Sequence, residues 1–151
     1  MPDLVLYQPD IPGNTGTLMR LAACTTTTLH IIEPAGFRLD DTALKRAGMD
    51  YLELAGLARH IDWDAFENWR GRSGRRLVLM STKTQTRLWD FAFRPDDLIL
   101  LGRESSGAPD SVHEAADHRL TIPMARGARS LNVALAGAMA LGEAIRQTAA
   151  A

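Results

Sequence analysis

The sequence has little of what secreted, membrane-spanning or cysteine-ligated metalloproteins need. Cys24 is the only cysteine among 151 residues, so the chain can form neither an internal disulfide nor a cysteine-based metal site. No apolar run is long and uncharged enough to span a membrane, and the first residues, with Asp3, do not resemble a secretory leader. We therefore expect a soluble, cytoplasmic protein. Cys24 lies in an apolar helical stretch, where we expect a buried and inert thiol.

An excess of one charge is also missing. Lys and Arg total 17 against 18 Asp and Glu, so any surface that binds nucleic acid has to be basic only locally. The length is that of one domain, and we expect a single domain over residues 1–151.

Common catalytic motifs are absent as well. The chain has no Walker loop, GRESSG at 102–107 is not a dinucleotide fingerprint, and no nucleophile elbow or paired-carboxylate pattern occurs. The four histidines are not spaced as metal ligands, so we expect structural or surface roles for them. They are His30, His60, His113 and His118.

Short apolar runs alternate with helical patterns along the whole chain. This alternation predicts an α/β fold with a parallel sheet flanked by helices on both sides. The predicted strands are Asp3–Tyr7, Thr28–Ile32, Leu77–Ser81, Asp97–Leu101 and Arg119–Ile122. One predicted helix follows a possible N-cap at Asn14. Further helices are predicted at Asp40–Ala47, Asp62–Trp69 and about Ser111–Ala116, and a last helix is predicted to begin at Leu131.

Two segments have an ordinary structural interpretation beside a functional one. Trp63, Phe66 and Trp69 recur at helical spacing, which favours core or edge packing over stacking on a ligand. The basic segment Arg70–Arg76 is typical of a solvated turn, although it could also contact phosphates.

The last helix is unusually apolar and rich in small residues. Ser130 stands where an N-cap is expected, and Ala136, Gly137, Ala138 and Gly142 would let another backbone approach closely. The helix could pack inside its own domain or against a partner chain. The basic loop before it favours packing against a partner chain and also predicts a ligand site near the start of the helix.

Three loops follow predicted strands: Met80–Thr82, Gly102–Gly107 and Ile122–Leu131. Ligands of open α/β sheets bind beyond the carboxyl ends of the strands, so we expect these loops to form one crevice. The residues alone do not identify the reaction.

Three segments resemble the motifs of SPOUT-class RNA methyltransferases: NTGTLMR at 14–20, LILLGRESSG at 98–107 and IPMARGARSLNVALAGAMALGEAIRQ at 122–147. LYQPDIPGNTGTLMRLAA, LHIIEPAGF and LKRAGMDYLE narrow the resemblance to the family of tRNA 2′-O-methyltransferases that act on the wobble cytidine or uridine. It extends from Leu4 to Gln147.

The resemblance implies a C-terminal trefoil knot that binds S-adenosylmethionine (S-adenosyl-L-methionine) and a homodimer formed through the last helix. The implied substrate is tRNA, with leucine tRNAs expected, and no metal is implied. The implied cofactor contacts are Met80, Ser81, Thr82, Gly102, Glu104, Ile122, Met124, Ser130, Leu131 and Asn132.

By the same resemblance, Arg20 is the residue nearest the 2′-hydroxyl, and Asn14 orients it or caps its helix. A guanidinium hardly deprotonates, so we expect Arg20 to stabilise developing alkoxide charge and not to act as the base. The candidates for RNA phosphate contacts, each also interpretable as a plain surface charge, are Lys45, Arg46, Arg126 and Arg129.

The chain departs from the family pattern at a few positions. Arg103 stands where proline is more usual, Ser105 and Ser106 replace a Thr-Arg pair, and Gly142 replaces a frequent tyrosine. Two alternatives stay open: a 2′-O-methyltransferase acting on ribosomal RNA or another tRNA position, and a catalytically silent knotted RNA-binding dimer.

Overall fold

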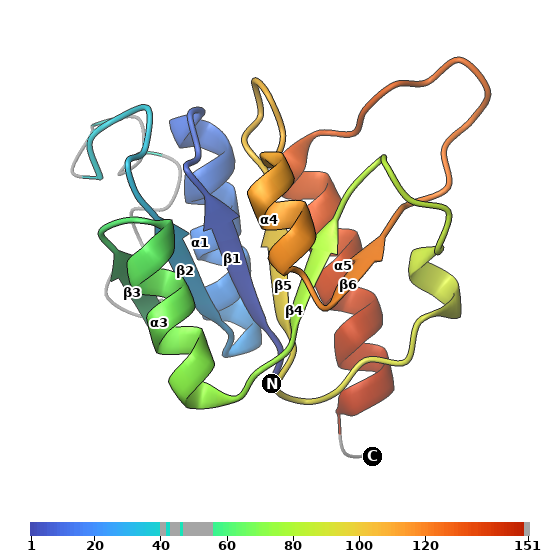
Figure 1. Ribbon diagram of the computed structural model, residues 1–151. Helices are drawn as coiled ribbons and strands as arrows, with labels where there is room; N and C mark the ends of the chain where they lie inside the picture. The colour runs from blue at the N-terminus through green and yellow to red at the C-terminus, as the bar shows by residue number, and fades with distance from the viewer. Residues whose placement is uncertain (40–41, 43–45, 47–55, 150–151) are drawn as a thin grey trace.

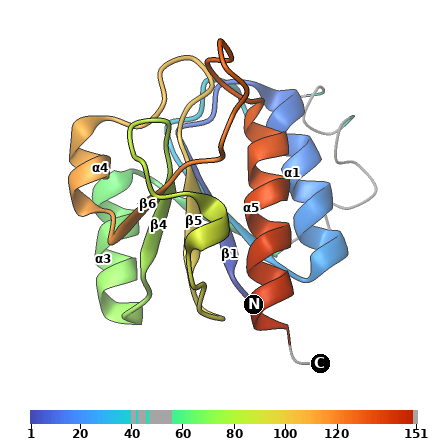
Figure 2. The same cartoon turned by 90° about the vertical axis from the view of Figure 1, so that its right-hand side faces the viewer.

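The fold is a three-layer sandwich around one parallel sheet, seen in a computed structural model that describes residues 1–39, 42, 46 and 56–149 (Figure 1). The six strands are ordered β3-β2-β1-β5-β4-β6, and every neighbouring pair is parallel. Figure 2 shows α1 and α5 on one face of the sheet and α3 and α4 on the other. The predicted α/β class, with helices on both sides of a parallel sheet, is confirmed.

The strands are short, and the four inner ones are largely apolar, whereas the two edge strands, β3 and β6, carry polar side chains. β1 lies at the centre, with Leu4 beside Leu29 of β2 and Ile99 of β5. The strands are β1 (Asp3–Tyr7), β2 (Thr28–Ile32), β3 (Gly56–His60), β4 (Leu77–Met80), β5 (Leu98–Leu101) and β6 (His118–Leu120). The helices are α1 (Pro12–Thr25), α3 (Trp63–Ser73), α4 (Asp110–Ala115), α5 (Val133–Thr148) and the 3₁₀ turn η2 (Leu88–Asp90).

Alternate residues of the central strands fill two cores, because neighbouring side chains of a strand point to opposite faces. Leu4 and Leu6 pack with α1 and α5, where Leu18, Met19 and Leu141 are buried. Val5, Leu79 and Leu100 instead pack with Phe66 of α3 and Val112 of α4. The strands are therefore covered on both sides, as their continuous apolar runs predict.

Most predicted elements are present, with bounds shifted by a few residues. β3 was not predicted, because GLARH is an edge strand with mostly exposed or half-exposed side chains and no apolar run. The helix predicted at Asp40–Ala47 lies outside the described residues, apart from positions 42 and 46. The knot implied by the resemblance stays a prediction.

The two helix caps were predicted wrongly. The N-cap of α1 is Ile11, and Pro12 occupies the first turn because its missing N–H has no helical partner there, so Asn14 falls inside the helix. The N-cap of α5 is Asn132, whose side-chain oxygen accepts hydrogen bonds from the Ala134 and Leu135 amides. Ser130 precedes this cap by two residues.

The prediction for Cys24 was also wrong: its side chain is exposed on α1. Leu18, Met19 and Ala22 form the buried face of that helix, and Cys24 falls on the opposite side. The aromatic residues of α3 pack as expected, with Phe66 fully buried and Trp63 and Trp69 partly buried around it.

The basic segment 70–76 is held by ion pairs. Arg70 contacts Glu67 and Asp117, Arg75 lies 2.7 Å from Asp3, and Arg76 lies 2.7 Å from Asp97. Asp3 and Asp97 lie at the amino ends of β1 and β5, so their pairs anchor the turn between α3 and β4 to these strands. The segment therefore has a structural role in this fold.

One face of α5 remains exposed. Ala134, Gly137, Ala140, Leu141 and Ala144 are buried against the domain, whereas Leu135 and Met139 are 57% and 39% exposed. Within the described part of the chain, no helix combines the length and apolar character needed to cross a membrane.

Candidate functional site

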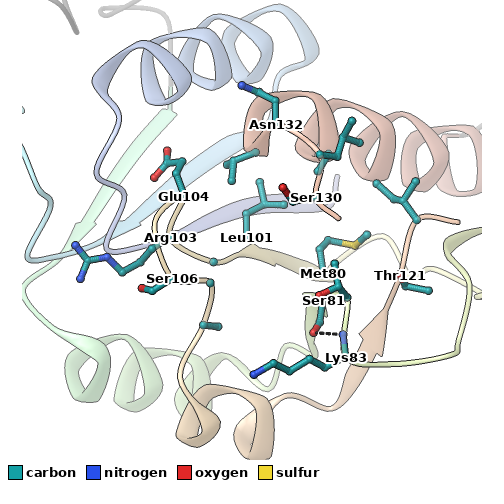
Figure 3. A pocket seen from close by; sticks show the side chains of 18 of the residues that line it. Met80, Ser81, Lys83, Leu101, Arg103, Glu104, Ser106, Thr121, Ser130 and Asn132 are labelled. Carbon is teal, nitrogen blue, oxygen red and sulfur yellow. Dashed lines mark hydrogen bonds between the residues drawn. The ribbon is translucent and has the colours of Figure 1, made fainter. Parts of the chain in front are cut away.

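A cavity of about 490 Å³ opens beyond the carboxyl ends of β4, β5 and β6 (Figure 3). Its volume is in the range of small-molecule and cofactor sites. The three loops that were predicted to form one crevice all line it. All ten residues expected to contact the cofactor are among its lining: Met80, Ser81, Thr82, Gly102, Glu104, Ile122, Met124, Ser130, Leu131 and Asn132.

The first wall follows β4. The Ser81 amide donates to the Leu120 carbonyl at 2.8 Å, which joins the end of β4 to β6. The Ser81 hydroxyl accepts a hydrogen bond from the Lys83 amide at 3.0 Å and so tightens the turn. Met80 and Leu101, at the ends of their strands, supply the apolar floor.

The second wall is the tight loop after β5. The backbone amide of Gly107 donates to the Arg103 carbonyl at 2.8 Å, and the backbone amide of Arg103 donates to the Gly107 carbonyl at 3.2 Å. Gly102 has no room for a side chain, because a Cβ there would lie 2.6 Å from the Ala108 nitrogen. Glycine at this position is thus required by the close approach of two backbone segments.

The third wall is the segment before α5, and Asn132 ties it to the other loops. The Asn132 amide nitrogen donates to Asn14 Oδ1 at 3.1 Å, while Asn14 Nδ2 donates to Glu104 Oε1 at 3.5 Å. The Asp10 backbone amide donates to Glu104 Oε2 at 2.9 Å. One polar network therefore connects α1, the β5 loop and the N-terminus of α5.

Two carboxyl groups of this network titrate in opposite directions. Burial raises the pKa of Glu104, and the neighbouring Asp10 side chain raises it further. Hydrogen bonding with Glu104 and Ser105 lowers the pKa of Asp10, and the positive charge of Arg103 adds to that effect. When the pair holds one proton, Glu104 is therefore the preferred carrier.

The remaining predicted residues are distributed differently. Asn14 and Arg129 line the cavity, whereas Arg20 is exposed on α1 and does not line it. Arg126 is exposed in the loop before α5, also outside the cavity lining, and Arg46 is exposed. Lys45 lies outside the described residues.

Several lining residues were not among the predicted contacts. The polar ones are Lys83, Arg103, Ser106, His113 and Thr121. Lys83 directly follows Thr82, so extending the predicted loop by one residue would have found it. His113 comes from α4, and only the packing of that helix beside the loops places it here.

No site for a metal ion forms in the described ranges, where no three His, Cys, Asp or Glu side chains gather suitably. His30 and His60 do meet, with their ring nitrogens 3.0 Å apart, but on the α3 side of the sheet among Phe66 and Trp69. Burial lowers the pKa of His60, and nearby His30 lowers it further. These two histidines are packing residues, as expected from their spacing.

The fold matches that of known methyltransferases. The SpoU methyltransferase AviRb of Streptomyces viridochromogenes, solved in complex with the cofactor AdoMet, superposes with a TM-score of 0.88 at 27% identity. The match covers 96% of this chain and 59% of that one. By its architecture, this chain is an S-adenosylmethionine-dependent methyltransferase of the SPOUT class.

The chain belongs to the SpoU rRNA Methylase family, whose model matches residues 2–142. It is 59% identical, over 145 residues, to the tRNA (cytidine(34)-2′-O)-methyltransferase of Ancylobacter novellus, covering 96% of this chain and 92% of the relative. A structure solved to explain the 2-OH methylation of C/U34 on tRNA superposes with a TM-score of 0.93 at 42% identity. That match covers 97% of this chain and 95% of the other.

Proposed function

We propose that this protein transfers a methyl group from S-adenosylmethionine to the ribose 2′-hydroxyl of the wobble nucleotide of tRNA, cytidine or uridine at position 34. The observation that carries the proposal is the 59% sequence identity, over 96% of this chain, to a tRNA (cytidine(34)-2′-O)-methyltransferase. It is combined with a cavity that is lined by all ten expected cofactor contacts. Leucine tRNAs are the expected substrates. Because the proposed substrate is tRNA, we also propose a cytoplasmic location.

The lining of the cavity suits this cofactor. Met80, Leu101, Ile122 and Leu131 offer apolar surface for an adenine ring, and backbone groups of the three loops offer hydrogen bonds at its edge. The Glu104 carboxyl and the Asn14 and Asn132 amides supply the polar groups for the ribose and the amino-acid part. When bound, S-adenosylmethionine supplies an electrophilic methyl group.

The task of the protein is alignment and charge stabilisation. An in-line displacement requires the 2′-oxygen to be held opposite the bond that breaks, and the network of Asn14, Glu104 and Asn132 gives the cavity wall a fixed shape. Arg20 is proposed to stabilise the negative charge that develops on the 2′-oxygen. Arg20→Lys tests this role, and near-normal turnover would exclude any function that needs the planar guanidinium.

The exposed apolar face of α5 supports the proposed homodimer. Leu135 and Met139, with Ala138 and Gly142, lie at positions three and four residues apart and form one stripe along the helix. Arg20 does not line the cavity of its own chain. It lies on α1, which packs beside α5, so a dimer formed through α5 would bring Arg20 near the cavity of the partner chain.

Phosphate contacts are proposed for Lys45, Arg46, Arg126 and Arg129. Arg126 and Arg129 flank Gly127 in the segment between β6 and α5, and Arg129 reaches the cavity. Since the whole chain is nearly neutral, affinity for tRNA should depend on this local group of cations. A salt dependence close to zero in tRNA binding would contradict the assignment.

The family description favours one second candidate, ribosomal RNA as the substrate. Purified protein incubated with methyl-labelled S-adenosylmethionine and either total tRNA or ribosomal RNA separates the two, and the proposal expects label in tRNA. Label only in ribosomal RNA would replace the substrate. Cofactor binding without transfer to either RNA would point to another substrate, and absence of cofactor binding would leave a silent RNA-binding dimer.

A further inference from the structure

Arg103 belongs to the loop after β5, and its side chain reaches the segment after β1. It begins the tight β5 loop, but its side chain points away from Met80 and Ser130 (Figure 3). Its guanidinium reaches the segment after β1, where Nη1 donates to Gln8 Oε1 at 3.4 Å and Nη2 lies 3.7 Å from Asp10 Oδ2. Arg103 thus joins the segment after β1 to the loop after β5.

The segment that Arg103 holds is conformationally demanding. Gln8 adopts a φ of 42°, in the left-handed region that residues with a side chain rarely occupy. On the other side, Gly36 packs so closely that a Cβ there would lie 2.7 Å from Asp10 Cβ. Such a conformation persists only when surrounding contacts fix it, and Arg103 supplies two of them.

The position of Asp10 has a direct consequence for the cavity. Its backbone amide donates to Glu104 Oε2, and Glu104 in turn accepts from Asn14, which is bonded to Asn132. A shift of the segment 8–10 would therefore move Glu104 and loosen the part of the wall where α1, the β5 loop and the N-terminus of α5 meet.

We propose that Arg103 is a positioning residue of the cofactor site. By holding the side-chain oxygen of Gln8 and the Asp10 carboxylate, it keeps Glu104 aligned with Asn14 and Asn132. The proposal rests on the cavity being the cofactor site, as proposed above.

Direct contact between Arg103 and the phosphate of an RNA substrate is the competing role. The geometry favours positioning, because the guanidinium already faces a carboxylate and its side chain is only 32% exposed. A phosphate would have to compete with Asp10 for Nη2 and with Gln8 for Nη1.

Arg103→Gln and Arg103→Lys test the proposal, with Arg87→Gln and Arg87→Lys as matched controls. Arg87 pairs with Asp90 on the surface and does not line the cavity. The first readout is the titration of Asp10 by carbon-13 NMR in the protein without ligand. Loss of the neighbouring cation in Arg103→Gln should raise the pKa of Asp10, because the carboxylate loses a favourable charge.

The second readout is the affinity for S-adenosylhomocysteine, measured by calorimetry. Arg103→Gln should weaken it on the order of tenfold, as for loss of one charged hydrogen bond. Arg103→Lys should fall in between, because lysine keeps the charge but loses the planar fork. The KM for tRNA should change less than about twofold, since positioning acts on the cofactor side.

An increased KM for tRNA, with unchanged Asp10 titration and cofactor affinity, would overturn the proposal and assign Arg103 to the RNA. Combining Arg103→Gln with Asp10→Asn should weaken cofactor binding no more than the worse single change, and additive losses would contradict action through Asp10. If the wild-type protein bound no S-adenosylhomocysteine, the proposed function would fail, while the Asp10 titration would still decide whether Arg103 controls that carboxylate.

Discussion

Asn132 caps α5 with its side-chain oxygen and, through its amide nitrogen, holds Asn14 of α1 at 3.1 Å. Residues 118 positions apart are thereby joined at the wall of the cavity. The cap and the link use different atoms of one side chain, so substitutions can separate them.

Asn132→Ala removes both functions, whereas Asn132→Asp keeps an oxygen for the cap and loses the donor to Asn14. We expect Asn132→Ala to lower the free energy of unfolding by about 1 kcal/mol, and Asn132→Asp to change it much less. Both should weaken S-adenosylhomocysteine binding. Urea unfolding and calorimetry measure the two effects, and full affinity in Asn132→Asp would show that the link to Asn14 is dispensable.

The sequence could predict this region only in part. The three loops were expected to meet because they follow predicted parallel strands, and they do meet. The cap was placed at Ser130, because a serine before an apolar run is a common signal, but the chain continues unwound to Asn132. No local pattern distinguishes these positions, since the link to Asn14 exists only in the folded chain.

The strands of the sheet, too, could be predicted from the sequence only in part. Central strands such as Leu98–Leu101 were predictable, since burial on both faces requires a continuous apolar run. Edge strand β3 was not, because its pairing with β2 is made by backbone groups while side chains such as Leu57 and Arg59 stay partly exposed. The exposed Cys24 shows that a generally apolar stretch does not tell which helix face is buried.

Gly102→Ala should abolish cofactor binding. The added methyl group would lie 2.6 Å from the Ala108 nitrogen and 2.7 Å from the Gly107 carbonyl carbon, so the loop has to move. Gly71→Ala is the matched control, since nothing lies within 4 Å of a Cβ there. In helix α3 this change should stabilise by up to about 1 kcal/mol. Calorimetry and thermal unfolding test both, and normal cofactor affinity in Gly102→Ala would refute the assigned role of this loop.

Arg75→Gln should lower stability in a pH-dependent way. Burial opposes ionisation of Asp3, but hydrogen bonds with His30 and Arg75 outweigh it and lower its pKa below 3.8. A carboxyl with a lowered pKa stabilises the fold above its unfolded value, and this contribution is lost as the pH falls through the folded value. We expect a loss of about 2 kcal/mol near pH 7 that diminishes towards pH 3.

Urea unfolding at both pH values measures this difference. Arg87→Gln serves as the control, because Arg87 and Asp90 form a pair that is more than half exposed and should contribute little. An equal loss for Arg75→Gln at both pH values would show that the effect does not depend on the ionised Asp3.

Leu135→Glu and Met139→Glu should each convert the proposed dimer to monomer, because a charge would be buried in an apolar interface. Ile61→Glu is the control at a position that is 76% exposed and away from α5. Sedimentation velocity gives the oligomeric state. Dimers that persist in both α5 variants would place the interface on another surface.

The most direct test of the central claim is mapping the methylated nucleoside. Transfer RNA from a strain that lacks this protein is incubated with wild-type protein and methyl-labelled S-adenosylmethionine, and the product is digested and analysed by mass spectrometry, with Gly102→Ala as the inactive control. We predict label as 2′-O-methylcytidine or 2′-O-methyluridine at position 34, in leucine tRNAs, with wild-type protein only. Label at another position, or none in tRNA despite bound cofactor, would contradict the proposed function.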